Sequence, residues 1–169
     1  VDLSKLLAGK IAQASPSIGD YTHGTSGSAS PRDLETALEL NYLAFTSPNL
    51  TREAFEIFKR RLVGMLENQA QNPRFVFSER VNLVNTSNHY SAKAPTPADI
   101  QALDLEAMTR FYKERFSNAA DFTFMIVGTF KEEEIVPLLE KWVASLPSTG
   151  KKGSNFRDMG VRFPPKIVK

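Results

Sequence analysis

The feature that most constrains this chain is the pattern over residues 26–73. A Gly/Ser-rich strand is followed by two amphipathic helices, with a short break at residues 47–49. Ser30 and Pro31 give the first helix an N-cap and a favourable first position, and Asp33 completes a capping box. Thr51 caps the second helix, in which apolar side chains recur every three or four residues. This order of elements predicts a sheet that is covered by helices.

The remaining elements are delimited by glycines, prolines and helix caps. Pro137 falls inside the last helix, so we expect that helix either to start late or to be kinked. Val161–Phe163 resembles a short strand that opens a following region. The expected helices and strands are a short helix at 2–8, strands at 10–18 and 20–28, helices at 30–47, 51–72, 72–84 and 104–116, a strand at 121–130 and a helix at 131–146.

Residues 121–130 give the clearest strand pattern in the chain. Phe122, Phe124 and Ile126 alternate with Met125 and Val127, so both faces of the strand are apolar. A strand that is apolar on both faces belongs in the middle of a sheet, covered by helices. We expect the helix at 51–72 to cover it.

The strand at 20–28 provides the candidate site. It carries Gly24, Ser26, Gly27 and Ser28, small residues whose backbone another chain can approach closely. Glycines inside a strand favour an edge position or a bulge. We therefore expect an edge that faces a partner or a peptide substrate. An ordinary edge strand, whose glycines discourage pairing with another chain, fits the pattern equally well.

Catalytic and metal-binding motifs are missing from the sequence. The two histidines, His23 and His89, lie far apart, so an HxxEH motif is impossible. Glu67 stands near the end of a long helix without a histidine partner. Ser26-Gly27-Ser28 is not a nucleophile elbow, because no strand, tight turn and helix surround it. We therefore expect no catalytic residue, no bound metal and no peptidase activity in the isolated chain.

Composition excludes several other classes of function. The 169 residues carry 21 basic and 19 acidic side chains, which gives a net charge of only +2 and no footprint for nucleic acid. No apolar run approaches the ~20 residues that span a bilayer. The chain has no cysteine, so disulfides are impossible and thiols say nothing about its compartment.

Several blocks of the sequence together resemble the pitrilysin/insulysin family of zinc metallopeptidases, the inverse zincins. The most specific block is FYKERFSNAADFTFMIVGTF, followed by an acidic helix and SLP, which is similar to the end of the family's α/β domains. LAGK followed by GSASPRDLETALEL is typical of the third of four such domains in the long, single-chain members. That domain is non-catalytic and belongs to the C-terminal half of those proteins.

The resemblance implies a fold, a domain division and a role. The fold would be α+β, with a mostly antiparallel sheet and helices on one face, as in LuxS and the mitochondrial processing peptidase. Residues 1–149 would form one non-catalytic domain, and residues 150–169 a linker and the start of the next. The chain would form part of the wall of a substrate chamber. Its partners would be the other domains of its polypeptide and the enclosed peptide, while zinc would sit in the parent's catalytic domain.

Two alternatives and the compartment stay open. The chain could instead belong to a catalytically inactive scaffold protein of the same fold. An upstream HxxEH motif in the parent sequence would favour the peptidase. A third hypothesis is an unrelated binding domain with an exposed apolar sheet face. For a bacterial parent, a periplasmic or secreted location is favoured slightly over the cytoplasm.

Overall fold

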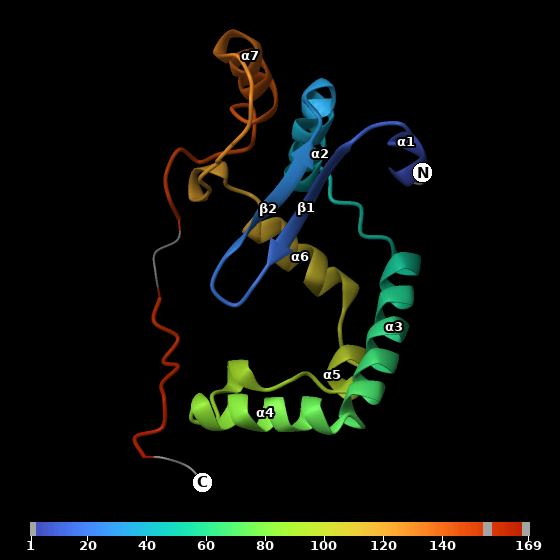
Figure 1. Ribbon diagram of the computed structural model, residues 1–169, viewed down its shortest axis with the longest axis vertical. Coiled ribbons are helices and arrows are strands. Elements are labelled where there is room, and N and C mark those ends of the chain that lie inside the picture. The colour runs from blue at the N-terminus through green and yellow to red at the C-terminus, as the bar shows by residue number, and fades with distance from the viewer. Residues whose placement is uncertain (1–2, 154–156, 167–169) are drawn as a thin grey trace. The chain divides into compact units, whose positions relative to one another are not determined.

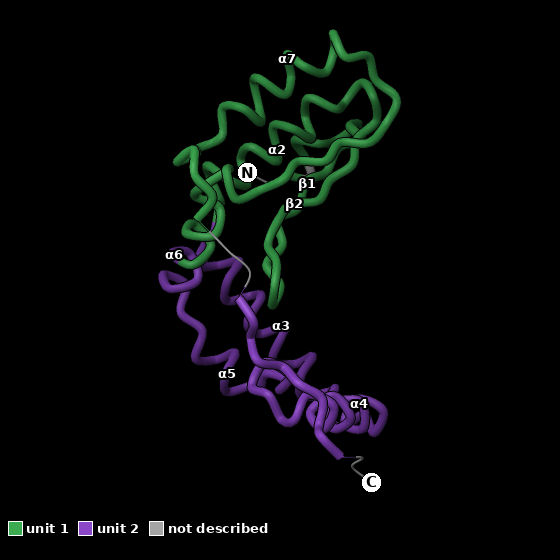
Figure 2. The backbone as a smooth tube through the Cα atoms, turned by 90° about the vertical axis from the view of Figure 1, so that its left-hand side faces the viewer, with its two compact units in different colours: residues 1–49, 111–155 green, residues 50–110, 156–169 purple. Residues whose placement is uncertain are grey.

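The structure is a computed structural model that describes residues 3–153 and 157–166. The chain forms two compact units, shown in different colours in Figure 2. Unit 1 comprises residues 1–49 and 111–155, and unit 2 comprises residues 50–110 and 156–169. Helices and an antiparallel sheet make the fold α+β, as the sequence predicts. Whether the domain ends at residue 149 stays a prediction.

Unit 1 is built around a β-hairpin that lies beside a helix (Figure 1). Its helix α6 starts in unit 2 and continues into unit 1 at Phe111. The elements are α1 (Leu3–Leu6), β1 (Ala12–Ile18), β2 (His23–Ala29), the 3-10 turn η1 (Pro31–Asp33), α2 (Leu34–Thr46), α6 (Leu105–Arg115), the 3-10 turn η3 (Ala119–Asp121) and α7 (Glu132–Trp142).

The hairpin confirms the two strands predicted from the first glycines and serines. β1 and β2 are antiparallel, and their register pairs Ala12 with Ala29 and Ile18 with His23. Pro16, which has no N–H to donate, lies opposite Thr25. Proline is tolerated in a strand only where its nitrogen faces away from the neighbouring strand. It therefore marks the outer edge of β1, in agreement with the expected edge position.

The start of α2 differs from the predicted capping box. Ser30 makes no side-chain cap, and a 3-10 turn precedes the helix. Instead, the Ser30 hydroxyl donates to the Asp33 carboxylate at 2.6 Å, and the Ile11 backbone N–H donates to the same carboxylate at 3.0 Å. Asp33 is buried. Its carboxylate therefore accepts the backbone N–H of Ile11, just before β1, and does not cap the start of the helix. These hydrogen bonds, led by that from Ser30, lower the pKa of Asp33.

An aromatic cluster forms the core of unit 1. Phe116 at the end of α6 is fully buried, with 0% of its surface exposed. The Phe45 and Phe116 ring centroids are 5.1 Å apart in an edge-to-face arrangement, and the Tyr112 ring stacks on Phe116 at 4.6 Å. Leu146 closes the cluster. The helical spacing of residues 104–116 places Phe116 and Tyr112 on the side of the core, where Phe116 is buried and Tyr112 half-buried, whereas Phe111 is 46% exposed.

The predicted central strand at residues 121–130 is wrong in its pairing. The described sheet has two strands, and residues 122–127 are extended without joining it. The alternation of faces is nevertheless present, because Phe122, Phe124 and Ile126 are half-buried between exposed neighbours. The covering helix also differs: the Phe124 ring lies 6.0 Å from that of Phe45 on α2. Phe58 on the expected helix belongs to unit 2 and is 48% exposed.

The last helix packs on α2 through polar and aromatic contacts. Glu35 accepts hydrogen bonds from Lys141 Nζ at 2.8 Å and from Trp142 Nε1 at 3.2 Å. The first of these bonds is the larger cause that lowers the pKa of Glu35. α7 begins at Glu132 and retains Pro137 in its interior. Of the two predicted outcomes for Pro137, a late start is therefore excluded.

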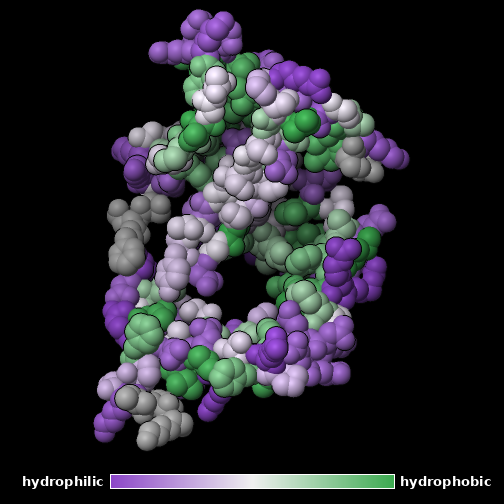
Figure 3. Space-filling view, in the orientation of Figure 1, coloured by the Kyte–Doolittle hydropathy of each residue, from purple (hydrophilic) through white to green (hydrophobic). Residues whose placement is uncertain are grey.

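Unit 2 is mainly helical, and apolar and polar residues alternate over the surface of its helices (Figure 3). Thr51 and Asn72 cap its two longest helices through their side-chain oxygens, as predicted. Val161–Phe163, expected to be a strand, has no regular structure. The elements are α3 (Arg52–Ala70), α4 (Pro73–Asn85), the 3-10 turn η2 (Tyr90–Ala92), α5 (Pro97–Gln101) and the first half of α6.

Candidate functional site

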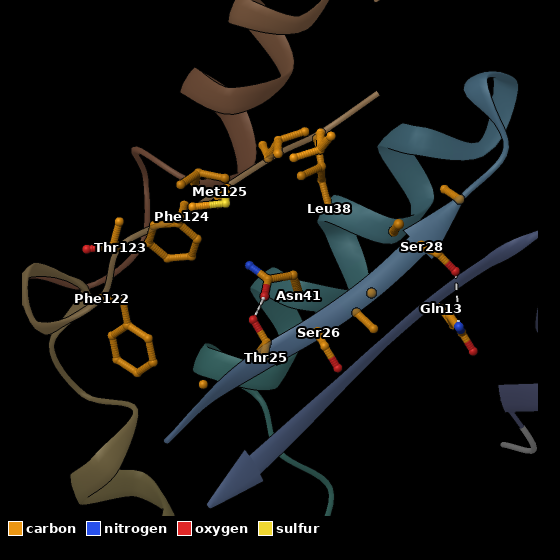
Figure 4. A pocket seen from close by; sticks show the side chains of 18 of the residues that line it. Gln13, Thr25, Ser26, Ser28, Leu38, Asn41, Phe122, Thr123, Phe124 and Met125 are labelled. Carbon is orange, nitrogen blue, oxygen red and sulfur yellow. Dashed lines mark hydrogen bonds between the residues drawn. The ribbon is translucent and has the colours of Figure 1, made fainter. Parts of the chain in front are cut away.

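A cavity of about 380 Å³ lies beside the hairpin, wholly within unit 1. One wall is β2, and the opposite wall is Asp121 at the end of η3 together with residues 122–127 (Figure 4). Leu34, Ala37, Leu38 and Asn41 of α2 line it together with Val143. We call this cavity the β2 groove. Because its walls come from segments far apart in the chain, only folding creates it.

The outer edge of β2 faces this groove. The backbone N–H of Ser30 bonds to the Ile11 carbonyl at 2.8 Å, just beyond the last strand pair. Hydrogen-bonded and non-hydrogen-bonded pairs alternate along an antiparallel ladder. Counting from this bond, Thr25 and Gly27 occupy the non-hydrogen-bonded pairs, opposite Pro16 and Ala14. Their N–H and C=O groups therefore point away from β1, towards the groove.

The four small residues predicted to form a partner-facing edge all line the groove. Gly24, Ser26, Gly27 and Ser28 lie in β2, and all but Gly24 are exposed. Gly27 has a further, internal reason to be glycine: a Cβ there would approach the Gln13 carbonyl oxygen to 2.5 Å. Part of the glycine pattern thus serves the packing of the hairpin itself. That this edge receives a partner or substrate stays a prediction.

The opposite wall has the side-chain pattern of a strand without a neighbour. Phe122 and Phe124 turn towards the aromatic core, where their rings contact that of Phe45. Met125 and Val127 are 84% and 88% exposed. Apolar side chains on both faces of an extended segment are normal inside a sheet and costly in water. The segment therefore has the composition of a strand inside a sheet, but it is not paired in the described sheet and its outer side chains are exposed.

A polar pair sits at the base of the groove. The Thr25 hydroxyl donates to the Asn41 side-chain oxygen at 2.6 Å. In Figure 4 the nitrogen of Asn41 points away from Thr25, towards the opposite wall. Asn41 is a half-buried residue of α2 to which the sequence analysis assigned no role. The available signal was an amide at a position where the helical pattern calls for an apolar residue.

Each of the two histidines makes contacts within its own unit. His23 packs edge-to-face on the Phe116 and Phe122 rings, at 5.8 and 5.1 Å between centroids. His89 is in unit 2, where its Nε2 lies 2.9 Å from the Met159 carbonyl oxygen. Within residues 3–153 and 157–166, no group of three His, Cys, Asp or Glu side chains is placed to hold a metal ion. In that same part of the chain, no helix has the length and apolar character of a membrane span.

Comparison with known proteins shows which proteins the chain is similar to. Residues 102–168 match the family described as Peptidase M16 inactive domain. The chain is 26% identical over 143 residues to a "Zinc protease PQQL-like" protein of Arabidopsis thaliana, and 24% identical over 132 residues to a "Probable zinc protease PqqL" of Haemophilus influenzae. The resemblance to the pitrilysin family is confirmed.

The fold of this chain also has a counterpart among solved structures. It superposes on the ferredoxin protease FusC, solved in complex with Arabidopsis ferredoxin, with a TM-score of 0.73. The superposition covers 93% of this chain and 17% of FusC, at 15% sequence identity. The matched regions cover 81% and 78% of the chain, but only 15% and 14% of the two curated relatives. The chain therefore corresponds to a small part of each relative.

Proposed function

We propose that the chain is a non-catalytic domain of a zinc-dependent endopeptidase and forms part of the wall of its substrate chamber. One observation carries this proposal: residues 102–168 match an inactive peptidase domain, and they include one wall of the β2 groove. The domain would correspond to the third of four in the long family members. It would enclose and select peptides, while zinc and the general base reside in another domain of the polypeptide.

The nature of the groove supports a role in binding. Its lining consists of the backbone of β2, small polar side chains and apolar side chains, together with His23 and Asp121. Such surfaces recognise extended polypeptide through backbone hydrogen bonds. FusC, the structural neighbour, is a protease in complex with a protein, and we extend this class of substrate, peptides and small proteins, to the parent of this chain.

The proposal is tested on the full-length protein that contains this chain. It should hold zinc by metal analysis after dialysis, cleave a quenched fluorescent peptide, and lose that activity when zinc is removed with a chelator. A peptide that carries a photoreactive group should cross-link to this domain as well as to the metal-bearing domain. The 169-residue chain alone serves as the control and should show neither zinc nor cleavage.

The inactive scaffold is the competing proposal, favoured by the match to an inactive domain. A polypeptide without zinc and without cleavage would support the scaffold and overturn the peptidase. A polypeptide that cleaves peptides but never cross-links through this domain would retain the peptidase and overturn the chamber wall. The two results are therefore distinguishable.

A further inference from the structure

We propose that Asn118 and Asp121 form a clamp that makes residues 147–153 a fixed part of unit 1. These residues read PSTGKKG, a composition typical of a flexible linker. In the structure, hydrogen bonds hold them instead against the turn that follows α6. The inference deepens the proposed function, because such a clamp fixes where the polypeptide leaves this domain. It rests on that function in one respect, namely that further polypeptide follows.

Asn118 is the centre of the clamp. It precedes the η3 turn, and only 9% of its surface is exposed. Its side-chain oxygen accepts the Thr149 backbone N–H at 3.0 Å and the Thr149 hydroxyl at 3.2 Å. Its side-chain nitrogen donates to the Lys151 carbonyl oxygen at 2.9 Å. A primary amide both donates and accepts hydrogen bonds, so this one side chain holds two residues of the segment.

Two further hydrogen bonds hold the ends of the segment. The Ala119 N–H donates to the Pro147 carbonyl oxygen at 2.8 Å. The Gly153 N–H donates to a carboxylate oxygen of Asp121 at 2.6 Å. A hydrogen bond to an ionised carboxylate is stronger than one between neutral groups. The segment is therefore bound at its start, its middle and its end to residues 118–121.

The segment also contains a turn of its own. Gly150 has a φ of +71°, a conformation that residues with a side chain rarely adopt. Its N–H donates to the Ser148 hydroxyl at 3.0 Å, and the Lys151 N–H donates to the Thr149 hydroxyl at 3.4 Å. The glycine and the two hydroxyl residues give the segment its linker-like composition. The same residues build its folded structure.

Both sides of the clamp are joined directly to the aromatic core. Phe116, two residues before Asn118, is fully buried, and Leu146, just before Pro147, is 4% exposed. The two side chains belong to the same hydrophobic cluster. Because both supports are packed there, the segment can move away only by breaking its hydrogen bonds. A connection of this kind transmits the position of the domain to the polypeptide that follows, whereas a flexible linker does not.

Hydrogen exchange of backbone amides in the full-length protein gives the first measurement. The Thr149 and Gly153 amides donate to Asn118 and Asp121. They should exchange at least about tenfold more slowly than in an unstructured peptide of the same sequence. An unclamped linker would show no such difference.

Four variants of the full-length protein assign this protection to the clamp. Asn118→Ala should return Thr149 to fast exchange, and Asp121→Ala should do the same for Gly153. Asp121→Asn keeps an oxygen that can accept the Gly153 N–H, so it should retain most of the protection. Asn49→Ala is the control, because Asn49 is an exposed residue of the same unit and makes none of these bonds. Circular dichroism checks that each variant folds, and the Asp121 pair decides the test even if Asn118→Ala does not fold.

Trypsin provides an independent measurement. Lys151 and Lys152 are exposed, and a protease cleaves a folded segment at a rate set by how often the segment opens. Cleavage after these lysines should be about tenfold faster in both alanine variants of the clamp than in the original protein. Cleavage after Lys93, an exposed lysine of unit 2, should proceed at the same rate in every variant and is the internal control.

Each outcome decides the inference. Slow exchange that is lost at Thr149 in Asn118→Ala, and at Gly153 in Asp121→Ala but not in Asp121→Asn, supports the clamp. Exchange in the original protein at the rate of the unstructured peptide overturns it and makes the segment an ordinary linker. Protection that survives both alanine variants also overturns it, because other contacts then hold the segment.

The test is separate from that of the proposed function, because neither measurement depends on zinc or on peptide cleavage. An inactive full-length protein with a protected segment would reject the proposed function and retain the clamp. An active protein whose segment is unprotected would reject the clamp and retain the proposed function.

Discussion

Truncation of Phe116 to alanine should be the most damaging single substitution in unit 1. Phe116 is fully buried at the end of α6. Its ring contacts those of His23, Phe45, Tyr112 and Phe122, with centroids between 4.6 and 5.8 Å away. The alanine variant would therefore remove the centre of the aromatic cluster and leave a cavity that four surrounding rings cannot readily fill.

The magnitude follows from the burial. Fully buried phenylalanines that are cut to alanine typically cost about 3–5 kcal/mol of unfolding free energy, from lost burial plus the cavity. Edge-to-face and stacked ring pairs place Phe116 in the upper part of that range, since such pairs add about 0.5–1.5 kcal/mol beyond area. A cost of this size is a large fraction of the whole stability of a domain.

The assay is urea unfolding followed by fluorescence of Trp142, the one tryptophan of the chain. Trp142 lies in unit 1 and contacts Tyr42, so its signal reports the unit that is perturbed. Tyr21→Ala is the control, because Tyr21 is in the same unit but 65% exposed, and it should cost under about 0.5 kcal/mol. A loss below about 1 kcal/mol in Phe116→Ala would refute the aromatic cluster as the core of unit 1.

Three further predictions concern charge, capping and metal. The pKa of Asp33 is lowered below its ordinary 3.8, so its stabilising effect is complete above that pH and is lost as the pH falls through the lower folded value. In Asp33→Asn, the free energy of unfolding followed by Trp142 fluorescence should fall less steeply as the pH is lowered. The same slope in the variant and the original chain would contradict this. Thr51→Ala should cost about 1 kcal/mol of α3 stability, measured by circular dichroism, while Thr51→Ser should restore most of it. The isolated chain should be free of zinc by metal analysis after dialysis, and stoichiometric zinc held by His23 or His89 would contradict that expectation.

Local signals in the sequence predicted the helices well. The cap at Thr51 forms as expected, and Asn72 and the Thr96–Asp99 capping box likewise cap the helices that follow them. These devices act within four residues, so the chain carries the whole cause in one short segment. The hairpin could also be predicted from the sequence, and Pro16 marks which edge of β1 faces outward. The family resemblance also came from contiguous blocks that need no folded structure.

The pairing of strands and the site could not be obtained in this way. The pattern at residues 121–130 predicted an interior strand, but a strand needs a neighbour, and the sequence does not say which segment supplies one. The same limit applies to the helix expected to cover it, since α2 and not α3 contacts Phe124. Ser30 and Asp33 matched a capping box, yet Asp33 instead accepts the Ile11 N–H from a distant segment.

The sequence by itself therefore determined the ends of several helices, the hairpin, the family resemblance and the small residues of β2. Only the tertiary structure decided that the outer edge of β2 faces residues 122–127 and that Asn41 stands between them. The physical reason is the range of the interactions. Caps and turns are set by neighbours along the chain, whereas a groove depends on segments about a hundred residues apart, whose meeting is fixed by burial of the aromatic core.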